Sequence, residues 1–329
     1  MKTDDRLAAM TAWVTQIEGF EDARPVPASE DASFRRYCRV EGDASYIVMD
    51  APPPMEDTAP FVTIAGYLTD MSLNAPRILE RDADSGFLLM SDLGSTQYLM
   101  VLEPEPSRAG QLYADAVDAL AIMQKDGARF QAALPPYDEK MMRFEMSLFR
   151  DWLCGTHLDL EFTADDEREW QRTCDALVDQ LLEQPRVFVH RDYHSRNLML
   201  TETDNPGILD FQDAVEGMHA YDLVSLLKDC YIAWPDDFVQ TNVDRFVERA
   251  GINDAGQFRR DFDIAGVLRH LKAAGIFARL FHRDGKPGYL KDIPRTVSYI
   301  AKLRSAYGEL EFLTNLIETR VLPALEQSA

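Results

Sequence analysis

Two segments of the chain carry residues whose types and spacing could transfer a phosphoryl group. The first, His190-Arg191-Asp192-Tyr193-His194-Ser195-Arg196-Asn197, has the pattern H-x-D-x-x-x-x-N after the apolar run 186–189. The second is Ile208-Leu209 followed by Asp210. Asp192 can accept the proton of a substrate hydroxyl, while Asn197 and Asp210 offer the oxygen ligands that Mg²⁺ prefers. The spacing therefore predicts phosphoryl transfer, the alternative being a hairpin whose acids are only structural.

The positioning of these residues requires a strand–loop–strand unit. Apolar and β-branched residues predict a strand at 186–189, a loop at 190–197 and short strands at 198–200 and 208–209. The turn residues at 204–207 join the last two strands. Such a hairpin presents two acids and one amide to a common point.

The rest of the chain predicts an α+β protein with two lobes. Strands are expected at 34–40, 46–49 and 86–90, so residues 1–94 form a small β-rich lobe with a connector near 91–96. Residues 95–329 form a large, mainly helical lobe. Apolar periodicity there predicts helices at about 107–125, 138–154, 163–183, 219–232, 236–249, 256–283 and 292–326.

Charge and cysteine content narrow the functional class. Fifty-six acidic residues against 34 basic ones give a net charge of −22, which repels nucleic-acid phosphates and anionic lipid. The four cysteines are widely spaced, which disfavours a disulfide framework or a zinc knuckle. No stretch reaches about 20 apolar residues and no secretory signal is visible. We expect a cytoplasmic monomer that binds neither nucleic acid nor membranes.

The two motif segments resemble the catalytic and metal-binding loops of the protein-kinase-like superfamily, in its aminoglycoside phosphotransferase branch. Further stretches are similar to the bacterial cell-wall-recycling kinases, which phosphorylate the anomeric hydroxyl of N-acetylmuramate and N-acetylglucosamine. These stretches are 32–37, 48–53, 87–94 and 281–286. The resemblance runs from about residue 28 to 305 and implies a two-lobed protein-kinase-like fold.

The resemblance also implies roles for individual residues. Asp192 would be the catalytic acid-base residue, and Asn197 and Asp210 would bind Mg²⁺. The backbone of Ser91, Asp92 and Leu93 would meet the adenine of ATP at the hinge.

Two further residues are expected to support the loop. His190 is expected to orient the loop as a core histidine, without reacting. Asp222, an acid at a helix start, is expected to cap or brace the catalytic loop.

Two departures from the family pattern concern the ATP phosphates. Residues 28–35 contain no glycine, so Ser29 and Ser33 with local backbone N–H groups are the candidates for a phosphate cradle, unless the segment is an ordinary turn. The strand lysine is missing from residues 46–50, so Arg35, or else Arg36 or Arg39, could supply the charge. Solvated strand charges are the alternative.

Candidates for acceptor contacts lie on two predicted helices. Family position suggests that the helix 138–154 borders the acceptor pocket, which makes Glu145 and Arg150 candidates for sugar contacts. Arg279 and Arg283 lie four residues apart on one helical face and could bind a carboxylate, unless they form a solvated basic face.

These expectations combine into an ATP- and Mg²⁺-dependent kinase that acts on the anomeric hydroxyl of the two amino sugars in peptidoglycan recycling. A phosphotransferase for a cationic acceptor, such as an aminoglycoside or choline, is the second possibility. The third is a catalytically idle nucleotide-binding scaffold, suggested by the missing lysine and glycines.

Overall fold

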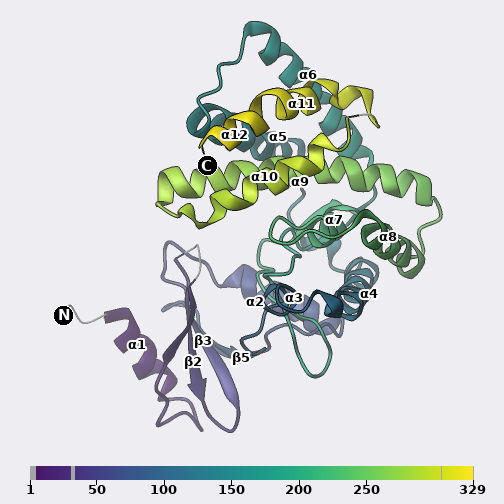
Figure 1. The fold of residues 1–329 in the computed structure, drawn as a ribbon. Coiled ribbons are helices and arrows are strands. Elements are labelled where there is room, and N and C mark those ends of the chain that lie inside the picture. The colour runs from purple at the N-terminus through teal and green to yellow at the C-terminus, as the bar shows by residue number, and fades with distance from the viewer. Residues whose placement is uncertain (1–4, 31–33, 305, 329) are drawn as a thin grey trace. The chain divides into compact units, whose positions relative to one another are not determined.

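The computed structural model describes residues 5–30, 34–304 and 306–328 and divides into two compact units (Figure 1). Unit 1 comprises residues up to Ala119 together with Arg196–Ala214, and unit 2 comprises Leu120–Ser195 and Val215 onward. A small antiparallel sheet comes first and a mainly helical remainder follows, which confirms the predicted α+β class. The predicted boundary near residues 91–96 lies within unit 1, and the division there stays a prediction.

Unit 1 is built on a five-stranded antiparallel sheet in the order β1-β2-β3-β5-β4. Cys38 pairs with Val48, and Val48 pairs with Leu89, so apolar side chains of three strands share one face. The strands are β1 (Val26–Glu30), β2 (Arg36–Glu41), β3 (Ser45–Asp50), β4 (Ile78–Asp82) and β5 (Phe87–Ser91).

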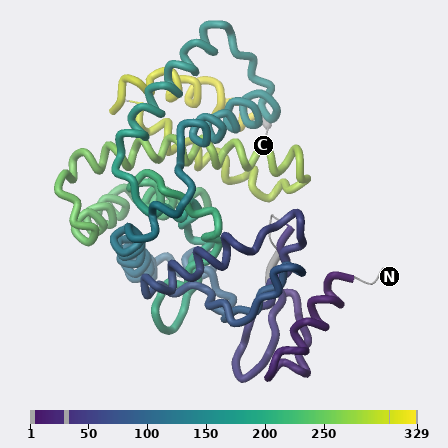
Figure 2. Tube along the Cα trace, turned by 180° about the vertical axis from the view of Figure 1, so that it is seen from behind, coloured from purple at the N-terminus to yellow at the C-terminus, as the bar shows by residue number. Residues whose placement is uncertain are grey.

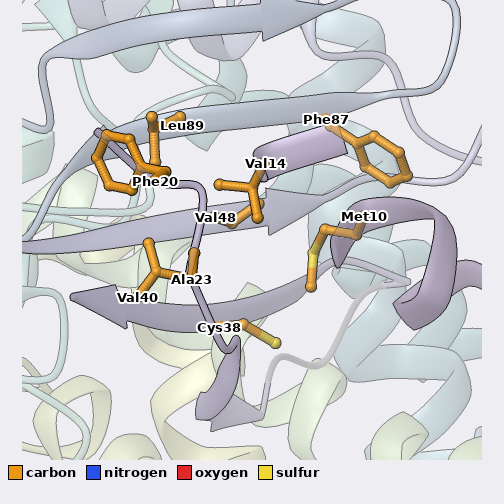
Figure 3. Packing of buried hydrophobic residues seen from close by; sticks show 9 residues of the cluster. All are labelled: Met10, Val14, Phe20, Ala23, Cys38, Val40, Val48, Phe87 and Leu89. Carbon is orange, nitrogen blue, oxygen red and sulfur yellow. The ribbon is translucent and has the colours of Figure 1, made fainter. Parts of the chain in front are cut away.

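Helix α1 (Asp5–Val14) covers that face of the sheet, and Figure 2 shows it from behind alongside the strands. Met10 and Val14 of this helix pack with Val48 in a buried cluster that also contains Phe20 and Leu89 (Figure 3). Unit 1 also contains α2 (Ala59–Asp70), α3 (Tyr98–Leu102) and the two-stranded hairpin β7 (Leu198–Met199) and β8 (Gly207–Ile208). Helix α4 (Ala109–Gly127) runs from the first unit into the second.

Unit 2 is organised around the 30-residue helix α9 (Ala255–Asp284), which is buried along most of its middle. Asp254 caps its start by accepting from the Gln257 N–H at 2.9 Å, and Gly285 ends it with φ +67°. Helices on several sides pack against α9, and Figure 1 shows α10 beside it. The other helices are α5 (Glu139–Leu148), α6 (Ala164–Glu183), α7 (Tyr221–Leu227), α8 (Asp236–Ala250), α10 (Ile293–Ala301), α11 (Glu311–Leu316) and α12 (Leu322–Ser328).

Two further features complete unit 2. A π-helical segment, Phe149–His157, continues α5, and a second one, Ile317–Val321, joins α11 to α12. Strand β6 (Arg186–Val189) pairs with β9 (Val215–Met218) in an antiparallel two-stranded sheet. Strand β6 leads directly into the loop that carries Asp192.

The predicted single helix over 292–326 is wrong. Helix α10 ends at Ala301, and helical structure resumes after Tyr307, whose hydroxyl donates to the Asp263 carboxylate of α9 at 2.8 Å. The predicted helix 219–232 is shorter as well, because α7 ends at Leu227.

Candidate active site

The first end of the loop after β6 is held by a buried carboxylate. Asp222, in the first turn of α7, accepts the backbone N–H of His190 at 2.6 Å and that of Arg191 at 2.9 Å. Burial raises the pKa of Asp222 to about 7, against the opposing effect of these two donors. Arg191 adopts φ +78°, so these contacts fix an unusual backbone turn directly before Asp192.

A second buried carboxylate holds the other end of the loop. Asp229 accepts both the N–H and the hydroxyl of Ser195 through Oδ2, at 3.0 and 2.6 Å. Its other oxygen accepts the N–H of Tyr231 at 2.9 Å. Sequence reasoning missed Asp229. The sequence signal that could have found it is Asp229-Cys230, directly after an apolar helix. An acid at such a place is buried and therefore needs hydrogen-bond donors.

His190 lies inside the protein beneath the loop. Its Nδ1 accepts the backbone N–H of Asp192 at 3.2 Å, and its ring meets the Tyr193 ring edge-on with centroids 5.7 Å apart. The unprotonated Nδ1 implied by this bond fixes the tautomer of the imidazole. The backbone of Asp192 is therefore positioned by a side chain two residues earlier in the chain.

The Asp192 carboxylate is half-buried and lies beside a buried cation. Lys272 Nζ of α9 is 3.8 Å from Asp192 Oδ1. Burial alone raises the pKa of Asp192. The charge of Lys272, assisted by His194 and Arg269, outweighs burial and holds the pKa of Asp192 well below its usual range. Asp192 is therefore ionised at neutral pH and can accept a proton.

Glu145, a predicted sugar contact, is buried in an ion-pair cluster next to Asp192. Arg191 Nη2 donates to Glu145 Oε1 at 2.6 Å, and Lys272 Nζ is 3.7 Å from the same oxygen. The Tyr137 hydroxyl donates to Glu145 Oε2. The structure thus brings Glu145 and Asp192 to one lysine, and the contact of Glu145 with a sugar stays a prediction.

Asn197 and Asp210, the predicted metal ligands, lie together on the β7–β8 hairpin of unit 1. The Asn197 amide donates to Asp210 Oδ2 at 3.2 Å, and the Leu209 N–H donates to the Asn197 carbonyl at 2.9 Å. Gln212 Nε2 donates to Asp210 Oδ1 at 2.9 Å. Asp210 has φ +62°, and the next residue, Phe211, is buried.

This donor set fits Mg²⁺ together with a nucleotide. Mg²⁺ in such sites takes one or two protein oxygens and completes its shell with phosphate oxygens and water. In the part of the chain that the structure describes, no cluster of three or more His, Cys, Asp or Glu side chains is placed to hold a metal by itself. The Asp210 carboxylate and the Asn197 amide offer oxygen donors of the kind that Mg²⁺ takes, and their contact with a metal stays a prediction.

The predicted hinge residues Ser91, Asp92 and Leu93 follow β5. The Asp92 carboxylate accepts from Arg39 Nε and from the Ser45 hydroxyl, both at 2.6 Å, and from the Gly94 N–H at 2.8 Å. These bonds fix the backbone at the end of the sheet.

The other two hinge residues also have contacts within unit 1. The Ser91 N–H donates to the Arg77 carbonyl at 3.0 Å, and the Ser91 hydroxyl accepts the Arg77 N–H at 2.9 Å. The Leu93 side chain lies against Gly207, where a Cβ would meet it at 3.1 Å. The contact of residues 91–93 with adenine stays a prediction.

The arginine candidates for phosphate binding all face carboxylates. Arg39 pairs with Asp92, Arg36 pairs with the buried Asp50, and Arg35 Nε lies 3.4 Å from Glu56. Ser29 lies in β1, while Ser33 is outside the described residues. Their role at the phosphates stays a prediction.

The remaining acceptor candidates differ in how they are engaged. Arg150 pairs with Glu167 and stacks over the Phe162 ring at 3.9 Å. Arg283 is exposed and forms a bidentate pair with its neighbour Asp284, at 2.8 and 2.9 Å. Arg279 is half-buried, and its Nε finds no hydrogen-bond partner among the described residues.

Comparisons with known proteins show the family of this chain. A model described as the phosphotransferase enzyme family matches residues 25–262. The chain belongs to this family. A relative from Pseudomonas aeruginosa, named N-acetylmuramate/N-acetylglucosamine kinase, is 46% identical over 96% of this chain and 97% of that protein. A relative of the same name from Pseudomonas putida is 43% identical over 95% and 96%.

Solved structures confirm the fold of this phosphotransferase. A choline/ethanolamine kinase family protein from Mesorhizobium loti aligns over 99% of this chain and 100% of its own, with a TM-score of 0.64 and 16% identity. This likeness confirms the predicted protein-kinase-like fold.

Within the described residues, no helix combines the length and apolar character needed to cross a membrane.

Proposed function

We propose that this phosphotransferase is an ATP- and Mg²⁺-dependent kinase that phosphorylates the anomeric C1 hydroxyl of N-acetylmuramate and N-acetylglucosamine in peptidoglycan recycling. The similarity over nearly the full chain to relatives with this substrate name carries the proposal. The contacts of Asp192 within unit 2, and separately those of Asn197 and Asp210 within unit 1, support the kinase chemistry. The use of ATP favours the cytoplasm as the place of reaction.

The acceptor side of the proposed reaction depends on Asp192. Its ionised carboxylate accepts a hydrogen bond from the C1 hydroxyl and takes the proton as the C1 oxygen bonds to the γ-phosphorus. The bond between the γ-phosphorus and the bridging oxygen of ATP breaks, and ADP leaves. His190, Asp222 and Asp229 hold the loop, so the carboxylate is positioned before the substrate arrives.

The donor side depends on Asn197 and Asp210. These residues would hold Mg²⁺, which when bound neutralises charge on the phosphate oxygens. The Gln212 and Asn197 amides each donate to an Asp210 oxygen and keep that carboxylate oriented. Arg279, with a half-buried Nε that lacks a partner among the described residues, is the proposed contact for the lactyl carboxylate of N-acetylmuramate.

A turnover screen tests the proposal. The purified protein is incubated with ATP and Mg²⁺ and with each amino sugar, an aminoglycoside or choline, and products are examined by phosphorus NMR. The proposal expects sugar 1-phosphates, recognised by coupling of the phosphorus to the anomeric proton, and turnover of the cationic acceptors at least about 100-fold slower. Preference for a cationic acceptor, phosphorylation at another hydroxyl, or ATP binding without turnover would contradict it.

A further inference from the structure

Lys272 is a cation placed in the most buried stretch of α9. It is 8% exposed, and its neighbours Leu271, Ala273 and Ala274 are buried as well. An ammonium group in such surroundings loses most of its hydration, and this cost requires nearby negative charge. The helix could have been packed with an apolar side chain at this position, so the charge itself needs an explanation.

The surrounding carboxylates provide that explanation. Lys272 Nζ lies between Glu145 Oε1 at 3.7 Å and Asp192 Oδ1 at 3.8 Å. Glu145 is already matched by Arg191, whose Nη2 approaches Oε1 to 2.6 Å. The positive charge of Lys272 is therefore matched by the negative charge of Asp192, the residue proposed to take the acceptor proton.

We propose that Lys272 is a positioning residue of the transfer reaction: it fixes the Asp192 carboxylate in place and keeps it ionised, while Glu145 fixes the lysine. This inference rests on the proposed role of Asp192. Lys272 lies in α9, 80 positions after Asp192 in the chain. The residue proposed to affect the reaction is therefore outside both loop motifs. Burial lowers the pKa of the Lys272 ammonium, but Asp192 and Glu145 outweigh burial and raise it, so the lysine stays charged.

Several other groups also face Asp192 and enter its titration. The surrounding titratable and charged groups are Arg191 and His194 of the loop, Arg269 and Lys272 of α9, Glu145 of α5, and Tyr221 and Asp222 of α7. Arg269 is itself engaged with the Ser225 hydroxyl at 3.0 Å and the Cys230 sulfur at 2.9 Å. Lys272 forms an ion pair with Asp192, with Nζ 3.8 Å from Oδ1.

The test compares Lys272→Met, which removes the charge and keeps the length, with Lys272→Arg, which keeps the charge. In Lys272→Met we expect kcat to fall about 10–100-fold with the KM for ATP within about threefold of the parent. The acid limb of the kcat profile should move up by about one pH unit or more, because an opposite charge has been removed from Asp192. In Lys272→Arg the acid limb should stay in place, and kcat should recover at least about fivefold over Lys272→Met.

Lys228→Met is the matched control. Lys228 is a half-buried lysine of the same unit whose Nζ pairs with Asp263 Oδ1 at 2.9 Å, so its loss tests the removal of a lysine ion pair elsewhere. We expect the pH profile of Lys228→Met to match that of the parent. Rates are compared with whichever acceptor the parent phosphorylates, so a wrong sugar assignment does not affect the comparison.

Two outcomes would overturn the inference. The first is a folded Lys272→Met with kcat within threefold of the parent and an unmoved acid limb. If Lys272→Met does not fold, Lys272→Gln takes its place under the same criteria. Failure of both neutral variants to fold beside a fully active Lys272→Arg would make the lysine a structural residue only.

Discussion

At the scale of single residues, the loop after β6 separates Asp192, the residue proposed to address the acceptor, from the carboxylates that hold the loop. Asp192 is half-buried and ionised, whereas Asp222 and Asp229 are fully buried and accept backbone N–H groups. The three acids therefore differ in function although all lie within 38 positions. Substitutions at Asp192 should change the rate of transfer without disturbing the loop.

Asp192→Asn should lower kcat by about 10²–10⁴-fold, since it removes the proposed general base without changing the shape of the side chain. Its affinity for Mg·ATP, measured by calorimetric titration, should stay within about twofold of the parent. Asp210→Ala is the comparison variant: it removes a proposed metal ligand and should weaken Mg·ATP binding as well as the rate. Turnover of Asp192→Asn within tenfold of the parent, or unchanged Mg·ATP affinity in Asp210→Ala, would refute the assignment.

Arg279 is expected to discriminate between the two amino sugars. N-acetylmuramate carries a lactyl carboxylate that N-acetylglucosamine lacks, and burying this group unpaired would cost several kcal/mol. Arg279→Ala should lower kcat/KM for the muramate by about tenfold or more, the scale of a charged hydrogen bond, and leave that for the glucosamine nearly unchanged.

Arg283→Ala should change the sugar ratio less, because Asp284 already engages that guanidinium. Equal losses on both sugars in Arg279→Ala, measured side by side, would show that this arginine belongs to a solvated basic face.

At the scale of elements, α9 is positioned by a close approach to the backbone where α5 meets the π-helical segment. A Cβ at Gly275 would lie 2.3 Å from the carbonyl carbon of Leu148 and 2.5 Å from the nitrogen of Phe149. Backbone atoms cannot move aside as a flexible side chain can. The absence of a side chain at Gly275 therefore sets the distance between α9, with Lys272, and α5, with Glu145.

Gly275→Ala should destabilise the protein by roughly 1–3 kcal/mol, as overpacking does. Gly266→Ala is the matched control on the same helix, since its Cβ would make an ordinary 3.4 Å contact with a Val224 methyl. That substitution should stay within about 1 kcal/mol of the parent, because alanine favours the helix. Denaturant titration measures both, and equal stability of the two variants would contradict this account of the packing.

The sequence predicts the loop, the hairpin and most helices because their signals are local. No strand was predicted over β1, which contains Pro27; an edge strand such as β1 tolerates proline. The helix over 292–326 was overextended because its apolar period continues past Ala301, where α10 ends, whereas Tyr307 contacts Asp263 of α9. Lys272 and Asp229 depend on contacts between distant segments, which periodicity does not report.

At the scale of the whole molecule, the net charge of −22 dominates. Like charges at this density repel one another and oppose the compact state. Dissolved salt screens such repulsion, with a Debye length of about 10 Å at 0.1 M. Isolated surface ion pairs contribute little to the free energy of unfolding. Their weakening by salt should therefore not cancel the stability gained from screening the repulsion.

The Tm should therefore rise by about 2 °C or more, or roughly 1 kcal/mol, between 20 and 300 mM NaCl at pH 7.5. The same increase in NaCl at a pH close to the sequence pI of 4.6 is the internal control, because the chain carries little net charge at that pH. Calorimetry at the two pH values measures the difference. A Tm that falls with salt at pH 7.5 would show that ion pairs outweigh the overall repulsion.

The two carboxylates that hold the loop also link its opening to that of a helix. The amide protons of His190 and Arg191 are donated to Asp222 of α7, and that of Ser195 to Asp229 just beyond this helix. These protons can exchange with solvent deuterium only when the bonds break, which requires α7 to separate from the loop. Although the loop at 190–197 has no regular secondary structure, its amide protons should exchange slowly and at the same rate as those of α7. The loop and α7 would then unfold as one cooperative unit.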